Sequence, residues 1–409
     1  MSPAGPSGRG SPTGPSGRAS PTGPISHAGP AAGLAGILSG ARFRATYLLQ
    51  GDEEEAQRKA RDICYEQTVE FPEDITPEGP IRDQIVGRVE ELTPAGPAAY
   101  RAVISYAVES AGDDIPQLLN VMFGNISLKT GIRVERFDLP EALLSLFPGP
   151  RFGRAGIRSL LGVPQRPLIC AALKPMGLSP RELAEQAYRF ARGGVDFIKD
   201  DHGLSNQTFS PFEERVARCA EAVQKARRET GTATLYLPNV TASTDKVHAR
   251  ARRARELGAG GLVITPGLAG LDVLRLLASD DSIALPLMSH PAFLGSFVTS
   301  AENGFGHAAL FGQLMRLAGA DVSVFPNYGG RFSFTREECA GIAHATREDM
   351  KGLKDAFPGP GGGMTRERIQ DMIEVYGRDF MLLSGGGMHR HSTDLERNAA
   401  YFVEMMSGA

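Results

Sequence analysis

The feature that most constrains the fold is a regular alternation of short apolar runs and helical segments beyond residue 165. Eight apolar runs of strand length lie at residues 168–173, 195–199, 234–238, 261–265, 285–289, 322–326, 355–358 and 380–383. Helical periodicity fills intervening segments at residues 181–191, 213–228, 246–257, 308–317 and 367–376. Eight strand–helix units over about 245 residues match a (β/α)8 barrel. We therefore predict an α/β fold whose C-terminal barrel carries the active site at the carboxyl ends of its strands.

Polar and charged side chains stand at the ends of these runs. They are Lys174, Lys199, Asp201, His202, Asn239, Thr265, His290, Asn327 and Arg331. Charges at a strand end cost little free energy only if they face solvent, a metal or one another. A strand that runs into a solvated loop is the ordinary explanation of any single run. The repetition at successive strand ends instead favours an active site on the barrel rim.

Two glycine triplets follow the seventh and eighth runs. They are Gly361, Gly362 and Gly363, and then Gly385, Gly386 and Gly387, which come after Ser384. A glycine triplet is otherwise often only a flexible turn. At these two positions barrel enzymes commonly bind phosphate with exposed backbone amides, so the triplets and Ser384 are predicted to bind an anion. Arg331, in a loop flanked by glycines, could close over the same anion.

Lys199 and Asp201 lie two residues apart and would share one face of an extended segment. A lysine beside aspartates normally stays protonated in an ion pair. If Lys199 instead captures carbon dioxide as a carbamate, it becomes an anionic oxygen ligand beside Asp201, and Mg2+ prefers such oxygens. We predict a site for one Mg2+ formed by Lys199, Asp201 and the adjacent His202.

The chain before the barrel divides into two parts. Residues 1–41 are rich in proline, glycine and serine, and residues 2–24 repeat a nine-residue unit, so this segment cannot build a core and is predicted to be a disordered tail. Residues 42–150 contain strand-like runs at 43–48, 102–106 and 131–136 and helical segments at 53–66 and 115–123. This mixture predicts a compact α+β domain. Proline and glycine cluster at 147–150, which places the barrel domain at residues 151–409.

Composition excludes several classes of function. The net charge of −3 gives no electrostatic reason to expect nucleic acid or an anionic membrane as a partner. No apolar run approaches the roughly 20 residues that span a bilayer, and no signal peptide pattern is present, so we expect a cytoplasmic protein. The four cysteines are scattered and suit neither a zinc cage nor a disulfide framework.

Taken together, these motifs resemble the large subunit of ribulose-bisphosphate carboxylase/oxygenase (RuBisCO). The resemblance rests on residues 172–179 and 193–201, on His290, on residues 319–321 with 330–331, and on both glycine triplets. It extends over about residues 43–405 in order and spacing. It implies a ferredoxin-like N-terminal domain, a C-terminal TIM barrel and a homodimer with shared active sites. Glu66 and Asn120 resemble the residues that the N-terminal domain lends to the neighbouring subunit's site.

Five positions depart from the carboxylase pattern. His202 replaces a glutamate ligand of magnesium, and imidazole suits zinc, copper or nickel better than magnesium. Met176 replaces a second lysine, and Arg331 aligns with the lysine that meets carbon dioxide. Pro291 and Val324 stand where the family places charged anchors for the second phosphate. We therefore expect no carbon dioxide fixation, and a substrate with one phosphate or one carboxylate.

These departures are typical of the RuBisCO-like proteins (form IV). The resemblance of this chain to them implies a reaction that passes through an enolate. The leading hypothesis is decarboxylation of a keto-sugar acid such as 3-oxo-isoapionate or its 4-phosphate. Lys174, Lys199, His290 and Arg331 are the catalytic candidates, with Lys174 or His290 as proton carrier and the metal as electrophile. The first alternative is an isomerase of methylthioribulose-1-phosphate or an enolase of diketo-methylthiopentyl phosphate in methionine salvage. The second is a non-catalytic binding or regulatory protein, which would not need a titratable Lys174.

The composition of the tail generates the first prediction. A chain that begins at Ala41 is expected to keep the melting temperature and the activity of the full-length protein, because residues 1–40 cannot bury apolar surface. Circular dichroism melting and turnover of the two proteins check this. Loss of the fold or of activity in the shortened chain would show that the tail has a role.

Overall fold

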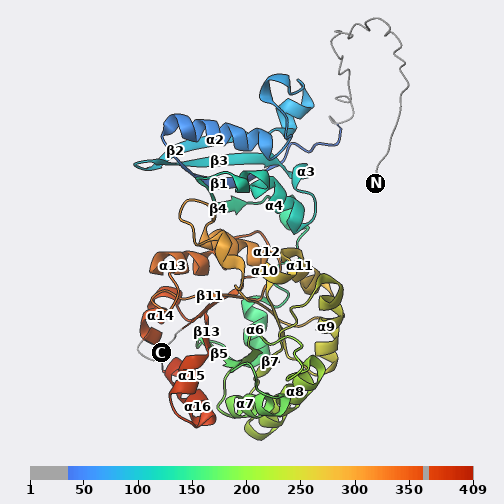
Figure 1. Cartoon of the computed structure of the whole chain (residues 1–409), viewed down its shortest axis with the longest axis vertical. Coiled ribbons are helices and arrows are strands. Elements are labelled where there is room, and N and C mark those ends of the chain that lie inside the picture. Colours follow the sequence, from blue (N-terminus) through green and yellow to red (C-terminus); the bar gives the residue numbers. More distant parts are fainter. Residues whose placement is uncertain (1–35, 363–367, 409) are drawn as a thin grey trace, which may run out of the picture.

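The computed structural model describes residues 36–362 and 368–408 of the chain. These residues form a five-stranded N-terminal sheet with its helices and an eight-stranded barrel, drawn below the sheet in Figure 1. Most of the predicted tail, residues 1–35, and Gly363 of the first glycine triplet lie outside the described residues. The predicted disorder of the tail therefore stays a prediction. No helix in the described part of the chain is long and apolar enough to cross a membrane.

The N-terminal sheet has the strand order β10-β4-β1-β3-β2. Its chain order is β1 (Arg42–Gln50), α2 (Glu53–Glu66), β2 (Arg88–Gly96), β3 (Ala99–Ala107), α3 (Val108–Ala111), α4 (Ile115–Phe123) and β4 (Ile132–Asp138), with short turns η1 (Glu73–Ile75), η2 (Ile81–Ile85) and η3 (Asn125–Leu128). β1 pairs antiparallel with β3 and β4, and β3 pairs antiparallel with β2. This is the expected ferredoxin-like arrangement. β2 was not predicted from the sequence, because its side chains are mostly exposed and show no apolar alternation.

The eight strands of the barrel are all parallel, in the order β7-β6-β5-β13-β12-β11-β9-β8. They are β5 (Leu168–Leu173), β6 (Phe197–Asp200), β7 (Leu235–Leu237), β8 (Leu262–Ile264), β9 (Leu287–Ser289), β11 (Val322–Pro326), β12 (Phe357–Gly361) and β13 (Met381–Ser384). A bridge between Asn239 and Val263 closes β7 onto β8. The predicted (β/α)8 barrel is confirmed. The seventh strand begins and ends later than predicted, so Gly361 belongs to the strand itself.

Helices surround the barrel. They are α7 (Pro180–Arg192), α8 (Phe212–Thr230), α9 (Thr244–Glu256), α10 (Pro266–Ala269), α11 (Leu271–Ser279), α12 (Met315–Leu317), α13 (Arg336–Ala345), α14 (Ile369–Tyr376), α15 (Gly386–Arg390) and α16 (Leu395–Ser407), with η4 (Leu294–Phe297) as a short 3-10 turn. The segment predicted as one helix at 308–317 begins as a π-helix, η5 (Ala308–Leu314), and continues as α12. α5 (Glu141–Leu144) and α6 (Gly153–Leu161) connect the N-terminal sheet to the barrel.

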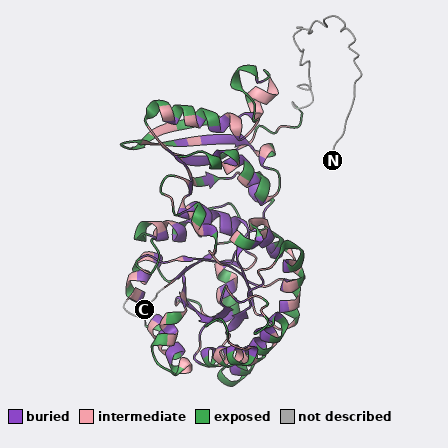
Figure 2. Cartoon of the chain, viewed as in Figure 1, coloured by how far each residue is buried: buried purple, intermediate pink, exposed green. Residues whose placement is uncertain are grey.

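A separate apolar cluster fills the inside of the barrel. Ile157 and Leu161 of α6 pack there against Phe197, Val263 and Met288 from three different strands. Figure 1 places α6 within the ring of strands, and the burial colouring of Figure 2 shows the strands themselves as buried. The interior is therefore a packed core at this end, and only the opposite end, where the strands finish, is open for a site.

A strand from the barrel half completes the N-terminal sheet. β10 (Gly304–Phe305) lies between η4 and η5 and pairs in parallel with β4. Gln313 of η5, which is buried, accepts a hydrogen bond from the Phe137 backbone N–H (3.0 Å) and donates one to the Phe137 carbonyl (2.8 Å). These contacts attach the N-terminal sheet to the segment between β9 and β11.

Candidate active site

A cavity of about 1330 Å³ lies at the carboxyl ends of the barrel strands. The predicted site residues in its lining are Lys174, Lys199, Asp201, His202, His290, Arg331, Gly361, Gly362, Gly385, Gly386 and Gly387. Ser384 is buried at the end of β13, and its hydroxyl has no hydrogen-bond partner among the described residues. The structure therefore brings together residues that are more than 200 positions apart in the sequence.

Asp201 is the centre of the polar contacts in this cavity. Its Oδ1 lies 2.8 Å from Lys174 Nζ and 3.2 Å from His202 Nδ1. Burial alone would raise the pKa of Asp201, but the hydrogen bonds from His202 and Lys174 and the charge of Lys199 hold that pKa well below its usual range. Asp201 is therefore a carboxylate that contacts the Lys174 amino group.

His290 follows β9 and faces the same residues. Its ring stacks on the His202 ring, with centroids 4.3 Å apart and planes 12° from parallel. Burial, supported by the charge of Lys199, lowers the pKa of His290 well below its usual range, so the ring is neutral at pH 7. The Ala292 backbone N–H donates to Nδ1 at 3.2 Å. The neutral ring therefore carries its proton on Nε2, where it can be donated to a ligand.

Lys199 is almost fully buried at the floor of the cavity, and its Nζ donates to the Asp200 carbonyl at 2.7 Å. Burial lowers its pKa, which favours the neutral amine that a carbamate requires. In the described part of the chain, no three His, Cys, Asp or Glu side chains cluster closely enough to hold a metal ion. The residues fit Mg2+ only when Lys199 carries a carbamate, which would add a second anionic oxygen group to that of Asp201.

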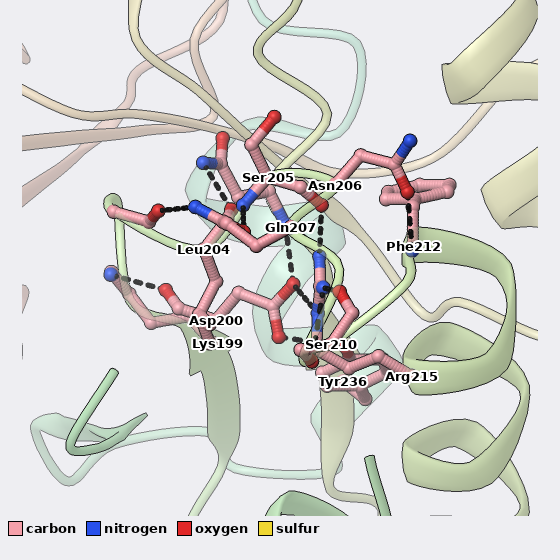
Figure 3. Close-up of polar contacts among 12 residues, drawn as sticks. Lys199, Asp200, Leu204, Ser205, Asn206, Gln207, Ser210, Phe212, Arg215 and Tyr236 are labelled. Atoms are coloured by element: carbon pink, nitrogen blue, oxygen red, sulfur yellow. Dashed lines mark hydrogen bonds and ion pairs between the residues drawn. The ribbon is translucent and has the colours of Figure 1, made fainter. Parts of the chain in front are cut away.

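A buried ion pair fixes the backbone behind this motif (Figure 3). Asp200 accepts hydrogen bonds from Arg215 Nε (3.0 Å) and from the Tyr236 hydroxyl (2.8 Å), and both partners of the ion pair have no exposed side-chain surface. Arg215 also donates to the carbonyls of Ser205 and Ser210. Since Asp200 precedes Asp201, this network holds the start of the β6–α8 loop and therefore the direction of the Asp201 carboxylate.

The residues of the two glycine triplets that line the cavity, 361–362 and 385–387, are called the glycine turns. The second turn lies beside Lys174, and the first lies beside Gly330, which precedes Arg331. A Cβ at Gly385 would come within 3.4 Å of Lys174 Cε, so the lysine stem passes next to this turn. Gly362 has φ of +96°, a conformation that side chains other than glycine rarely adopt. The Arg331 guanidinium lies 5.0 Å from the centre of the Phe332 ring and lines the cavity.

Glu66 and Asn120 do not reach the barrel cavity of their own chain. They line a separate cavity of about 350 Å³ on the N-terminal domain, which shares no lining residue with the first one. Asn125 Nδ2 donates to Glu66 Oε1 at 3.0 Å. Within one chain, these two residues therefore lie near each other but apart from the other predicted site residues.

Several lining residues were missed by sequence analysis. Arg390 ends the short helix that starts in the second triplet, and His391 next to it stacks on Tyr401 at 4.5 Å. Their position three and four residues after the triplet was a signal that could have identified them. Apolar lining residues that were also missed are Phe293, Phe311, Phe325, Phe332, Phe334 and Phe402. Phenylalanines in these segments look like ordinary core residues in the sequence.

Comparisons with known proteins show that the chain is similar over most of its length to members of one family. The family model of the ribulose bisphosphate carboxylase large chain, catalytic domain, matches residues 154–400. The 5-methylthioribulose-1-phosphate isomerase of Rhodospirillum rubrum is 37% identical over 369 residues, which cover 90% of this chain and 97% of the relative. The 2,3-diketo-5-methylthiopentyl-1-phosphate enolase of Geobacillus thermodenitrificans is 37% identical, with 85% of this chain and 87% of the relative covered. The crystal structure of a Rubisco-like protein from Rhodopseudomonas palustris superposes with a TM-score of 0.80 at 37% identity, covering 90% of this chain and 97% of that one.

The buried ion pair generates a stability prediction. Arg215→Met is expected to lower the free energy of unfolding by about 3–5 kcal/mol, because it leaves the Asp200 charge buried without its partner. Arg218→Met is the matched control on the same helix: its ion pair with Glu214 is about half exposed, and its loss is expected to cost less than about 1 kcal/mol. Urea unfolding of the three proteins measures both values. Equal losses in the two variants would contradict the role given to Arg215.

Proposed function

Because the chain belongs to the ribulose bisphosphate carboxylase large-chain family, as one of its RuBisCO-like members, we propose that it moves a proton next to the carbonyl of a small keto-sugar phosphate. The observation that carries this proposal is Lys174 Nζ 2.8 Å from Asp201 Oδ1, in one cavity with the His290 ring and both glycine turns. Two relatives are named as a 5-methylthioribulose-1-phosphate isomerase and a 2,3-diketo-5-methylthiopentyl-1-phosphate enolase, so their names place both on phosphorylated keto compounds. We place the present chain in the same class of reaction.

The neutral His290 ring has one clear role in such a reaction. Its Nε2–H can donate to the carbonyl oxygen of the substrate and so stabilise the negative charge that develops there. Lys174 is the group we assign to proton transfer, since its Nζ lies in the cavity and its stem passes beside Gly385. The backbone amides of the glycine turns, with Arg331, hold the phosphate.

We further propose that a magnesium ion is bound by Asp201 and by a carbamate on Lys199, with His202 beside them. When bound, the ion supplies an electrophile that spreads the charge of the enolate. His202 directs its Nδ1 to Asp201 and stacks on His290, so it orients both of these groups. Asn239 donates to the His202 carbonyl at 2.9 Å and thereby fixes the backbone of this residue.

We also propose a homodimer in which Glu66 and Asn120 of one subunit complete the barrel cavity of the other. Both residues line a small cavity on the N-terminal domain, away from their own barrel site. The carboxylate and amide groups there could contact a polar substrate across a subunit interface. An archaeal family member of known structure is described as dimeric.

A second candidate function is decarboxylation of a keto-sugar acid, such as 3-oxo-isoapionate or its 4-phosphate. The observation that favours it is the excess of basic side chains in the cavity, where Lys174, Lys199, Arg331 and Arg390 outnumber the single acidic side chain, Asp201. These cations could hold a carboxylate, and the same enolate then forms by loss of carbon dioxide instead of a proton.

One experiment distinguishes the two functions. In deuterium oxide, the protein is expected to convert 5-methylthioribulose 1-phosphate or 2,3-diketo-5-methylthiopentyl 1-phosphate to a product with carbon-bound deuterium. Proton NMR monitors this conversion. Lys174→Met is expected to slow this conversion by about 10²–10⁴-fold. Release of carbon dioxide from 3-oxo-isoapionate or its phosphate would establish the second candidate. No turnover of any of these compounds would support a binding role, and fixation of labelled bicarbonate on ribulose bisphosphate would contradict both candidates.

The metal proposal makes a separate prediction. Lys199→Met is expected to abolish magnesium binding together with turnover, because it removes the carbamate, whereas His202→Gln should keep most of both. Isothermal titration with Mg2+ in bicarbonate buffer measures binding independently of activity, and circular dichroism checks that each variant is folded. An inactive His202→Gln protein beside an active Lys199→Met protein would mean that the histidine is the ligand or the acid–base group.

A further inference from the structure

Phe293 has an unusual backbone at the rim of the cavity. Its φ is +69°, and Glu70, Ala284 and Lys351 are the other non-glycine residues with positive φ in the described ranges. Of these four, Phe293 is the one that lines the cavity, and it is 68% exposed. A bulky aromatic residue in the left-handed region is strained, and such strain persists only where the surrounding structure imposes it.

The turn that carries Phe293 is fixed on both sides. Leu294 donates its N–H to the Pro291 carbonyl at 3.0 Å, and its side chain is almost fully buried. The short helix α10, which follows β8, packs directly against the turn: a Cβ at Gly267 would lie 2.7 Å from the Ala292 carbonyl oxygen. Because Ala292 also binds the His290 ring, the same turn orients His290 and presents Phe293 beside it.

The surroundings of Phe293 are apolar. Pro291 and Ala292 of the same loop line the cavity, as do Val324 and Phe325 at the end of the neighbouring strand β11. Lys174, Lys199, Asp201 and Arg390 belong to or follow β5, β6 and β13, and the glycine turns lie at the ends of β12 and β13, whereas Arg331 stands in the loop after β11. The cavity is therefore polar where a phosphate can bind and apolar around the loop that follows β9.

We propose that Phe293 is a specificity-determining residue that covers an apolar substituent at the end of the substrate away from its phosphate. The strained turn holds the ring over that end of the substrate, next to the His290 that contacts the carbonyl. The chain therefore selects sugar phosphates with an alkyl or thioether end over those that end in a hydroxyl group. This inference rests on the proposed function for the site, but it concerns binding and not the proton transfer.

The test uses two probes without a carbonyl, 5-methylthioribitol 1-phosphate and ribitol 1-phosphate, so that no turnover occurs. By isothermal titration, the full-length protein is expected to bind the methylthio probe about tenfold or more tightly than ribitol 1-phosphate. Phe293→Gly is expected to reduce this preference to about threefold or less. Phe297→Gly is the matched control: Phe297 is 42% exposed on the same turn, lies outside the described lining of the cavity, and its loss should leave the preference unchanged.

Stability and assembly provide a second measurement. Since glycine adopts a positive φ without strain, Phe293→Gly is expected to melt at a higher temperature than Phe297→Gly, although both lose one exposed ring. Size-exclusion chromatography should give the same mass for both variants. The inference is overturned if the unaltered protein binds both probes equally or binds neither, if Phe293→Gly keeps the preference, or if that variant changes the oligomeric state. If the unaltered protein prefers the methylthio probe and Phe293→Gly loses that preference, but no keto-sugar phosphate is turned over, the proposed function alone is overturned.

Discussion

The geometry of the site depends on the buried ion pair between Asp200 and Arg215. Taking two charges out of water costs several kcal/mol for each ion, so such a pair persists only where further hydrogen bonds satisfy both groups. Here Tyr236 and the Asn239 backbone donate to Asp200, and two loop carbonyls accept from Arg215. Successive residues of a strand face opposite sides. The hydrogen bonds of Asp200 outside the barrel therefore position Lys199 and Asp201 on the inside. A change in those hydrogen bonds is expected to shift both of these side chains.

The barrel could be predicted from the sequence because its strands are buried on both faces. Such strands are nearly continuous apolar runs, as in β5, where all six residues are buried. The residues at the ends of these runs could also be assigned to the site, because a charged residue directly after a buried strand must lie at the rim of the barrel. This is why Lys174, Asp201, His202 and His290 were identified together and line one cavity. β10 was not predicted, because two residues give no pattern.

Other parts of the site could not be predicted, since they depend on contacts between loops. The stacking of His202 on His290 joins the ends of β6 and β9, and no spacing in the sequence indicates it. The left-handed backbone of Phe293 lies in a turn whose Ala292 carbonyl packs against Gly267 of α10, which only the folded chain brings near. Glu66 and Asn120 were identified through a family resemblance, and their place in one chain is a separate cavity.

The charges of the cavity have a consequence for how it binds anions. Apart from the histidines, four basic side chains (Lys174, Lys199, Arg331 and Arg390) and one acidic side chain (Asp201) line it, in a chain whose net charge is −3. The proposed conversion of Lys199 to a carbamate would replace one cation with an anion, and a bound dication would then restore the same excess of three positive charges. The electrostatic attraction for an anionic substrate is therefore similar in the two states. In the proposed reaction, binding of the phosphate at the glycine turns would not require the metal, whereas stabilisation of the enolate charge near Asp201 and His290 would depend on it.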